Sequence, residues 1–211
     1  MAYFPFFMEI GGRRCVIVGG GHVALRKAEK LLSFSPEITV IAPQICEALA
    51  ALPVICLRRE FRQSDLDGAF MVIAATNDRL LNHRIYTLCE AQKIPVNTVD
   101  DVENCSFIFP ALVHEPPVSV GISTGGASPV FAKYLRMLIE EELTEKAIGT
   151  ANILCRFRPI VREMFSKEKL RREALEAVLD LCQTGDTLPS DDEVQELLER
   201  IYENQNRNAA E

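Results

Sequence analysis

A glycine-rich stretch between an apolar run and a helix-like pattern carries the clearest potential for chemistry. It consists of Gly19, Gly20, Gly21, His22, Val23 and Ala24, which fit the pattern G-x-G-x-x-A. In this pattern Gly19 permits a tight turn, Gly21 lets the backbone approach a pyrophosphate, and Ala24 lets helix and strand pack closely. The N–H groups of the helix N-terminus then face the phosphates. The stretch predicts a dinucleotide-binding turn, against the alternative of a bare structural turn.

Candidate nucleotide contacts also follow two later strand-like runs. Pro43 and Gln44 come after "ITVIA", where an acidic residue usually holds the ribose hydroxyls. Neither is a carboxylate or an arginine, so this position does not choose between NAD and NADP; Gln44 either bonds a ribose hydroxyl or caps a helix. Thr76 and Asn77 follow "FMVIAA" and can hydrogen-bond a nucleotide. Alternatively, Asn77 or Asp78 caps the next helix.

Metal-binding potential is sparse in the sequence. The seven cysteines are odd in number, and no cysteine or histidine pair has the spacing of a zinc site. His114, in "LVHEPP", is a candidate iron ligand or acid–base residue, with a surface loop residue as the alternative. The sequence therefore leaves the metal site open, with His114 as its one candidate.

Composition narrows the class of protein. The chain has 211 residues, 48% of them hydrophobic, and a formal net charge of -7. This acidic balance argues against nucleic acid or an anionic membrane as the main partner, but it permits an anionic small molecule. The longest strongly apolar run, Ala69–Ala75, is too short to span a bilayer, and the N-terminus is a poor signal peptide. With reduced thiols, these features predict a soluble cytoplasmic protein.

The elements that must position these residues alternate through the first half of the chain. Buried strands are expected at Cys15–Val18, Ile38–Ala42, Val54–Leu57, Phe70–Ala75 and Ile94–Val99. Helical patterns follow the glycines and cover about residues 80–92. Strands rich in Val and Ile that alternate with helices predict an α/β fold with a parallel sheet, helices on both faces, and a ligand at the carboxyl ends of the strands.

The pattern changes after Pro110. A strand entered through a diproline is expected at Pro116–Ser123, and a helix over about 130–143 that is capped by Ser128 and starts with Pro129. The remaining segments, near 147–165, 168–182 and 191–204, all read as helices.

Five motifs in one order resemble the precorrin-2 dehydrogenase family, the N-terminal module of siroheme synthase. They are "FP-F" at Phe4–Phe7, "CVIVGGGHVALRKAEKLL", "AATND", "VNTVDDVENCSFIFPA" and "VGISTGGASPVFAKYLR". The resemblance covers about residues 1–150, and the helical remainder matches in general character. It implies NAD-dependent oxidation of precorrin-2 to sirohydrochlorin in siroheme biosynthesis, with ferrous iron insertion in some members. It also implies a Rossmann domain (1–112), a dimerisation segment (113–146) and a helical C-terminal domain (147–211) in an intertwined homodimer.

The resemblance also assigns site residues. The family's important acid maps onto Asp100 in "NTVDD", for which the residues alone favour a loop acid or a helix cap; Asp101 is not separable from it by spacing. The nucleotide contacts map onto Gly19–Val23 and onto Pro43 and Gln44. Thr124, beside Ser123, matches a family serine of regulatory or pocket function, with a turn residue as the alternative.

The tetrapyrrole substrate carries several carboxylates, so cations are expected around it. Lys133 and Arg136 lie three residues apart on one helical face, with Arg13, Arg14 and Arg26 as alternatives. Three other functions stay open: a bifunctional enzyme that also inserts iron, a non-catalytic NAD-binding redox sensor, and a Rossmann fold with an emptied site. The acidic chain lacks the basic helix-turn-helix of a DNA-binding sensor.

Overall fold

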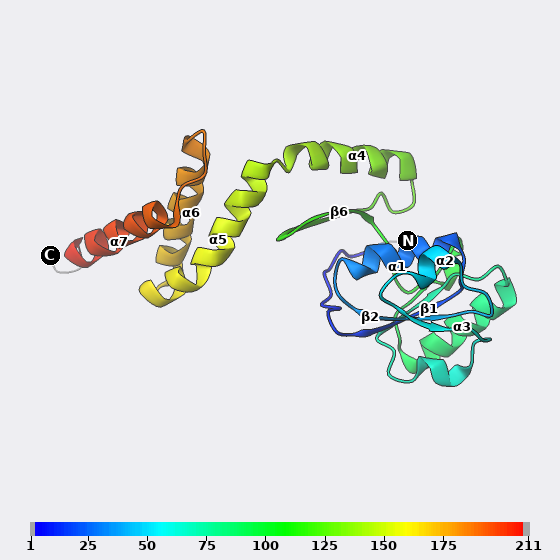
Figure 1. The fold of residues 1–211 in the computed structure, drawn as a ribbon. Coiled ribbons are helices and arrows are strands. Elements are labelled where there is room, and N and C mark those ends of the chain that lie inside the picture. Colours follow the sequence, from blue (N-terminus) through cyan, green and yellow to red (C-terminus); the bar gives the residue numbers. More distant parts are fainter. Residues whose placement is uncertain (1–2, 209–211) are drawn as a thin grey trace. The chain divides into compact units, whose positions relative to one another are not determined.

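The computed structural model describes residues 3–208 and divides them between two compact units. One unit is Phe6–Phe109, and the other runs from Pro110 onward and includes residues 3–5. The first is an α/β unit and the second combines a β-hairpin with four helices (Figure 1). The α/β class with an additional helical part, expected from the sequence, is confirmed.

A five-stranded parallel sheet forms the centre of the α/β unit. Its strands are β1 (Arg14–Val18), β2 (Glu37–Ile41), β3 (Ile55–Leu57), β4 (Met71–Ala74) and β5 (Val96–Thr98). Their order in the sheet is β3-β2-β1-β4-β5, and every adjacent pair is parallel. The strand order reverses between β1 and β4, which is where such sheets bind ligands.

Helices cover both faces of this sheet because successive strand residues point to opposite sides. On one face, Cys15 and Ile17 pack with α1 (His22–Leu32) and α2 (Glu47–Ala50). On the other, Val16 and Val18 pack with α3 (Arg79–Gln92). Two short 3-10 turns, η1 (Gln63–Leu66) and η2 (Val102–Asn104), complete the unit.

The second unit begins with a hairpin that the sequence predicted only in half. Strands β6 (Ala111–Glu115) and β7 (Val118–Ile122) are antiparallel, and the diproline forms the turn between them. The expected strand entered through the diproline is confirmed as β7, which starts at Val118. The segment around His114, for which no strand was expected, is the strand β6. Helix α4 (Pro129–Glu142) packs on this hairpin, and Ser128 Oγ caps it by accepting from the Phe131 N–H, as expected.

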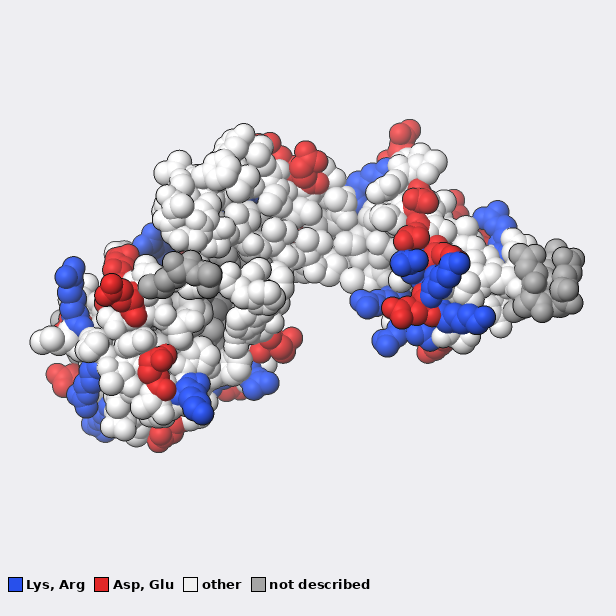
Figure 2. Space-filling model, turned by 180° about the vertical axis from the view of Figure 1, so that it is seen from behind, with Lys and Arg blue, Asp and Glu red and all other residues white. Residues whose placement is uncertain are grey.

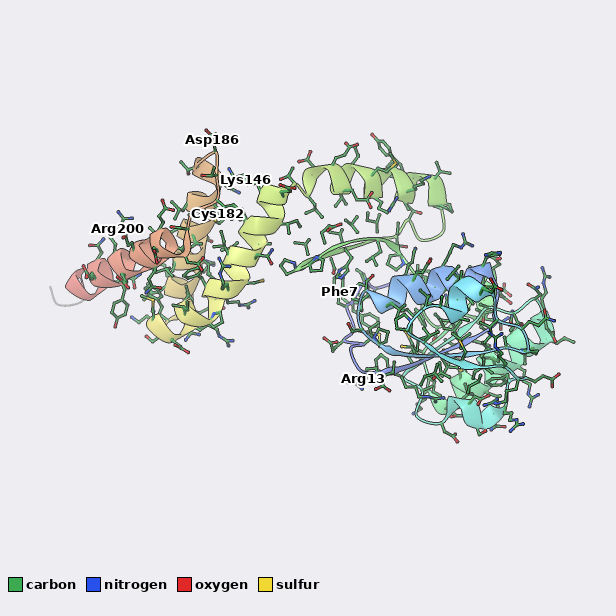
Figure 3. The ribbon with its side chains drawn as sticks, in the orientation of Figure 1. Phe7, Arg13, Lys146, Cys182, Asp186 and Arg200 are labelled. Atoms are coloured by element: carbon green, nitrogen blue, oxygen red, sulfur yellow. The ribbon has the colours of Figure 1, made fainter. Side chains whose placement is uncertain are left out.

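Three further helices enclose a separate apolar core. They are α5 (Glu145–Met164), α6 (Glu168–Thr184) and α7 (Asp191–Asn208). Val161, Val178 and Leu198, one from each helix, are fully buried there. Lys146 of α5 donates to the backbone carbonyls of Gln183 and Gly185, so a positive charge sits at the C-terminus of α6 (Figure 3).

None of the helices that the structure describes is long and apolar enough to cross a membrane.

Candidate active site

The glycine turn lies at the carboxyl end of β1, where the strand order reverses. Gly19 has a φ of +132°, and a Cβ atom there would lie 2.2 Å from the Ala75 carbonyl oxygen. A Cβ atom on Gly20 would lie 1.9 Å from the carbonyl oxygen of Gln44. A Cβ atom on Gly21 would meet nothing within 4 Å. Gly19 and Gly20 are thus required because a side chain at either position would clash with the protein's own backbone, whereas Gly21 borders open space.

This open space is suited to an anion. The N-cap of α1 is Gly21, so no side chain at this position caps the first N–H groups of the helix. The first turn also contains no acidic residue. The N–H groups there and the positive end of the helix dipole remain available to a phosphate. His22 is exposed and Val23 half-buried at the start of the helix. The cradle therefore fits the pyrophosphate of a dinucleotide.

Pro43 and Gln44 are exposed just beyond β2, beside the glycine turn. The Gly20 carbonyl accepts from the Cys46 N–H at 2.9 Å, which ties the two loops together. Cys46, and not Gln44, is the N-cap of α2. The helix-cap alternative for Gln44 was wrong, and its exposed side chain stays a candidate ribose contact.

The residues after β4 divide between structural and available groups. The Thr76 hydroxyl donates to Asn82 Oδ1 at 2.7 Å, and it accepts from the Asp78 N–H at 3.1 Å. Asp78 is the N-cap of α3 and accepts from two N–H groups of the first turn. Of the two residues expected as caps, Asp78 is therefore the cap. Asn77 is exposed and remains a candidate nucleotide contact.

The structure separates the two adjacent acids after β5. Asp101 is the N-cap of η2: its carboxylate accepts from the Asn104 backbone at 3.4 Å and from the Asn104 side-chain amide at 2.6 Å. Asp100 is exposed, has a φ of +58°, and its carboxylate makes no hydrogen bond in residues 3–205. Asp101 thus serves the turn, and Asp100 is left for another partner.

Next to Asp100, the end of β5 carries an orphaned polar atom. Thr98 is 3% exposed, and its Oγ1 is the one buried side-chain N or O atom in the described chain that lacks a hydrogen-bond partner. Its backbone is anchored by Cys105, whose thiol donates to the Thr98 carbonyl. Because an unsatisfied buried hydroxyl costs free energy, a polar group of a bound ligand is a natural partner for it.

Lys27 is a further residue of this region that sequence reasoning missed. Its ammonium nitrogen lies 3.9 Å from the centroid of the Phe109 ring. Burial, followed by repulsion from Lys30, lowers the pKa of Lys27 from 10.5 to about 8, while Cys105 and Asp100 act in the opposite direction. The only sequence signal was a lysine one turn after Val23 on the helix that follows the glycines.

Three of the four predicted substrate residues of the second unit have local partners. Thr124 Oγ1 accepts from the Ser128 N–H at 3.1 Å, as expected for a turn residue, and Ser123 Oγ accepts from the Gly125 N–H at 3.2 Å. Arg136 pairs with Glu140 at 2.8 Å. Lys133 is exposed and forms no ion pair in the described chain.

His114 lies on β6, not in a loop. Its Nδ1 is 2.7 Å from Ser119 Oγ on the facing strand. Within the described residues, no group of three His, Cys, Asp or Glu side chains is gathered that could hold a metal ion.

The alternative candidates for binding the substrate carboxylates, Arg13, Arg14 and Arg26, lie at different places in the α/β unit. Arg14 begins β1 and donates to the carbonyls of Asp65 and Asp67. Arg13, labelled in Figure 3, directly precedes β1, and its guanidinium group lies over the Phe70 ring. Both are thus at the amino end of β1, opposite the glycine turn. Arg26 is exposed on α1.

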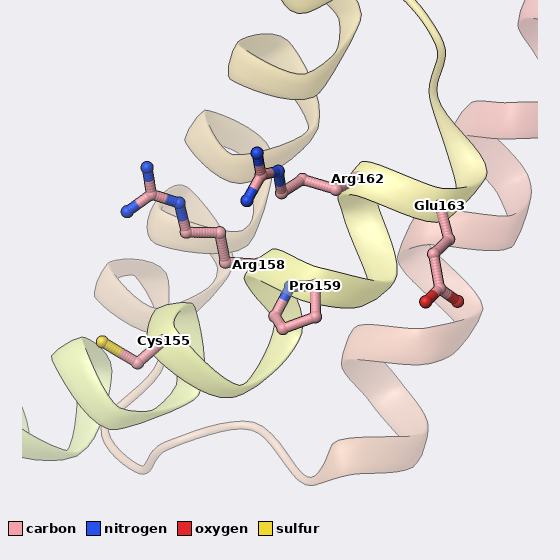
Figure 4. Close-up of a pocket in the computed structure, with 5 residues that line it drawn as sticks. All are labelled: Cys155, Arg158, Pro159, Arg162 and Glu163. Carbon is pink, nitrogen blue, oxygen red and sulfur yellow. The ribbon is translucent and has the colours of Figure 1, made fainter.

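Helix α5 carries a surface hollow that none of the predicted site residues lines. It is lined by Cys155, Arg158, Pro159, Arg162 and Glu163 (Figure 4). The two arginines are one helical turn apart and point the same way. No residue predicted to bind nucleotide or substrate contributes to this hollow.

The sheet order and the glycine cradle at its switch point define a dinucleotide-binding protein of the Rossmann class. A family model described as "Putative NAD(P)-binding" matches residues 6–111, about half of the chain, and one described as "Sirohaem biosynthesis protein central" matches residues 117–142. The chain belongs to this NAD(P)-binding family. The predicted NAD cofactor and the resemblance drawn from the motifs are confirmed.

Curated relatives agree with this assignment, and a solved structure shares the fold. The chain is 40% identical over 184 residues to a siroheme synthase of Thioalkalivibrio sulfidiphilus, covering 85% of this chain and 38% of that protein. It is 34% identical over 212 residues to a siroheme synthase of Neisseria meningitidis serogroup C, covering 96% and 44%. It therefore spans less than half the length of these relatives. A solved structure titled "SirC, precorrin-2 dehydrogenase" matches its fold with a TM-score of 0.69 at 22% identity, covering 95% of this chain and all of that one.

Proposed function

We propose that the chain is an NAD-dependent dehydrogenase that oxidises precorrin-2 to sirohydrochlorin in siroheme biosynthesis. The observation that carries this proposal is the free, exposed Asp100 carboxylate at the carboxyl end of β5, on the same edge of the sheet as the glycine cradle. The siroheme synthases among its relatives supply the substrate class. The proposal concerns the part of those longer proteins that this chain spans.

The residues divide the chemistry between binding and proton transfer. NAD, when bound, accepts the hydride that the macrocycle loses. The α1 N-terminus beside Gly21 holds the pyrophosphate, and Gln44 and Asn77 are the candidate contacts to the rest of the nucleotide. Asp100 takes the proton that leaves the substrate, as a carboxylate free of structural hydrogen bonds can. The products are then sirohydrochlorin, NADH and a proton.

An anaerobic assay tests this function. Purified protein, precorrin-2 and NAD are mixed, and NADH formation is followed together with the visible spectrum of the tetrapyrrole. One NADH per sirohydrochlorin is expected. NAD binding without any NADH would overturn the proposal in favour of a redox sensor. Ferrous iron, added as a substrate after the oxidation, tests whether the same protein also inserts iron.

We also propose that the protein is a homodimer, with residues 113–146 as the dimerisation segment, and that it works in the cytoplasm. Helix α4 supports the dimer because its exposed apolar residues recur at helical spacing. They are Val130 (79% exposed), Phe131 (51%), Tyr134 (53%), Met137 (46%) and Leu138 (39%). The face of this helix that Figure 2 shows carries few charges. A second copy is the expected cover for such a stripe.

Substitution on this stripe is expected to break the dimer. Phe131→Glu places a charge in the proposed apolar interface, so the dissociation constant of the dimer should rise by at least about 100-fold. Size-exclusion chromatography with light scattering over a concentration series measures it. Lys133→Glu, an exposed change of charge on the same helix, is the control. A wild-type protein that is monomeric at all concentrations would contradict the dimer.

A further inference from the structure

Lys27 connects the helix of the nucleotide cradle with the segment that carries Asp100. Its side chain leaves α1 and its ammonium group lies over the ring of Phe109, 3.9 Å from the centroid. Asp100 and Cys105, from the same segment as Phe109, interact with it electrostatically. The ammonium group therefore lies in the neighbourhood of the proposed proton acceptor.

The charge on Lys27 is poorly compensated by the protein. Arg26 and Lys30, its neighbours on α1, carry the same sign, and Asp100 is the one carboxylate that acts on it. Burial raises the pKa of the Cys105 thiol, which disfavours its thiolate form. In residues 3–205, neither Lys27 nor these two neighbours is part of an ion pair. A partly desolvated ammonium group with an excess of positive neighbours is stabilised by an added anion.

We propose that Lys27 is a substrate-binding residue, whose ammonium group binds a carboxylate of the tetrapyrrole and so places the macrocycle beside Asp100. This inference rests on the proposed function. Its second support is the orphaned Thr98 hydroxyl, which is buried at the end of the strand that leads to Asp100 and lacks a partner in the described chain. A hydroxyl without a partner and a cation without an ion pair both indicate a polar ligand in this region.

A dinucleotide phosphate is the competing anion, and position on the helix argues against it. Lys27 follows the N-cap Gly21 by six residues, which corresponds to about 9 Å along the helix axis. The phosphates are expected at the N-terminus itself, where the free N–H groups lie. Lys27 instead lies over Phe109, on the segment of Asp100. The carboxylate of the substrate is therefore the assigned ligand.

The assignment predicts a pH dependence of substrate affinity. Burial lowers the pKa of Lys27 to about 8 in the free protein, so the ammonium form dominates below that pH. A bound carboxylate favours the charged form and raises the pKa of Lys27 in the complex. Binding is then linked to proton uptake above pH 8, and affinity should fall as the pH rises beyond it. The titratable and charged groups that act on Lys27 are Lys30, Arg26, Cys105 and Asp100. All four are unchanged in the variants below, except that Lys30 is itself replaced in the control variant.

The experiment is a titration of the full chain with sirohydrochlorin, followed by the absorbance of the tetrapyrrole, at several pH values. Lys27→Met, which keeps the apolar stem over Phe109, should weaken binding about tenfold at pH 7 and abolish the decline above pH 8. Lys27→Arg should restore much of the affinity and also lack the decline, because arginine stays charged. Lys30→Met removes an exposed charge from the same helix and should change affinity less than about threefold.

Turnover and calorimetry complete the design. In Lys27→Met, the KM for precorrin-2 should rise more than kcat falls, NAD affinity should stay unchanged, and the unfolding temperature should be no lower than that of the wild type. Equal sirohydrochlorin affinity of wild type and Lys27→Met would overturn the role of Lys27 alone. Loss of NAD affinity with unchanged tetrapyrrole affinity would also overturn it, and would assign Lys27 to the dinucleotide. A wild-type protein that binds no tetrapyrrole would overturn the proposed function, and this inference with it.

Discussion

Asp100→Asn is expected to lower kcat for precorrin-2 oxidation by a factor of about 100 to 10,000, the range for loss of a positioned general base. The amide keeps the size of the carboxylate but cannot accept the proton. NAD affinity should stay within about twofold, because Asp100 is exposed and makes no hydrogen bond in residues 3–205 that its loss would break. Asparagine is preferred to alanine here: the φ of +58° is left-handed, and asparagine tolerates that region.

The control for this prediction is the neighbouring acid. Asp101→Asn keeps an oxygen that can accept from the Asn104 N–H but loses the oxygen that accepts from the Asn104 side-chain amide. It should therefore cost about 1 kcal/mol of stability and change kcat only a few-fold. Steady-state kinetics and thermal unfolding of both variants separate the two roles. If Asp100→Asn turned over at the wild-type rate while Asp101→Asn did not, the assignment of the base would move by one residue.

The cradle could be predicted from the sequence because its causes are local. A strand, three glycines and an amphipathic helix follow one another directly in the sequence. The spacing of the apolar residues therefore predicts which of them are buried, namely Val16 and Val18 in the strand and Ala24 and Ala28 in the helix. The cap of α4 is equally local, since Ser128 and Pro129 precede the helix directly. Such features need no knowledge of distant contacts.

Other parts of the site depend on tertiary structure. Asp100 and Asp101 have the same chemistry, and only the backbone turn after β5 makes one a cap and leaves the other free. The environment of Lys27 comes from Phe109 and Cys105, which are far from it in sequence. Strand β6 was missed because its residues gain strand geometry only by pairing with β7 across the diproline. The hydrophobic pattern of a short stretch of sequence contains no information about these distant contacts.

Gly20→Ala and Gly21→Ala are expected to affect different properties, stability in the first and NAD affinity in the second, although the substitutions are chemically identical and adjacent. In Gly20→Ala the new methyl group would lie 1.9 Å from the Gln44 carbonyl oxygen, a backbone atom that cannot rotate away. The two loops must separate, and the Cys46 N–H to Gly20 carbonyl hydrogen bond at 2.9 Å is strained or lost. The α/β unit should lose at least about 3 kcal/mol of stability.

In Gly21→Ala the methyl group enters open space, and the φ of -93° is accessible to alanine. Stability should therefore change by less than about 1 kcal/mol. NAD affinity should nevertheless fall at least about tenfold, because the methyl group occupies the space that the pyrophosphate needs for close approach. Denaturant unfolding and calorimetric NAD titration measure both quantities. Unchanged NAD affinity in a stable Gly21→Ala protein would mean that the dinucleotide does not lie against α1, and the site would then have to be sought elsewhere on the carboxyl edge of the sheet.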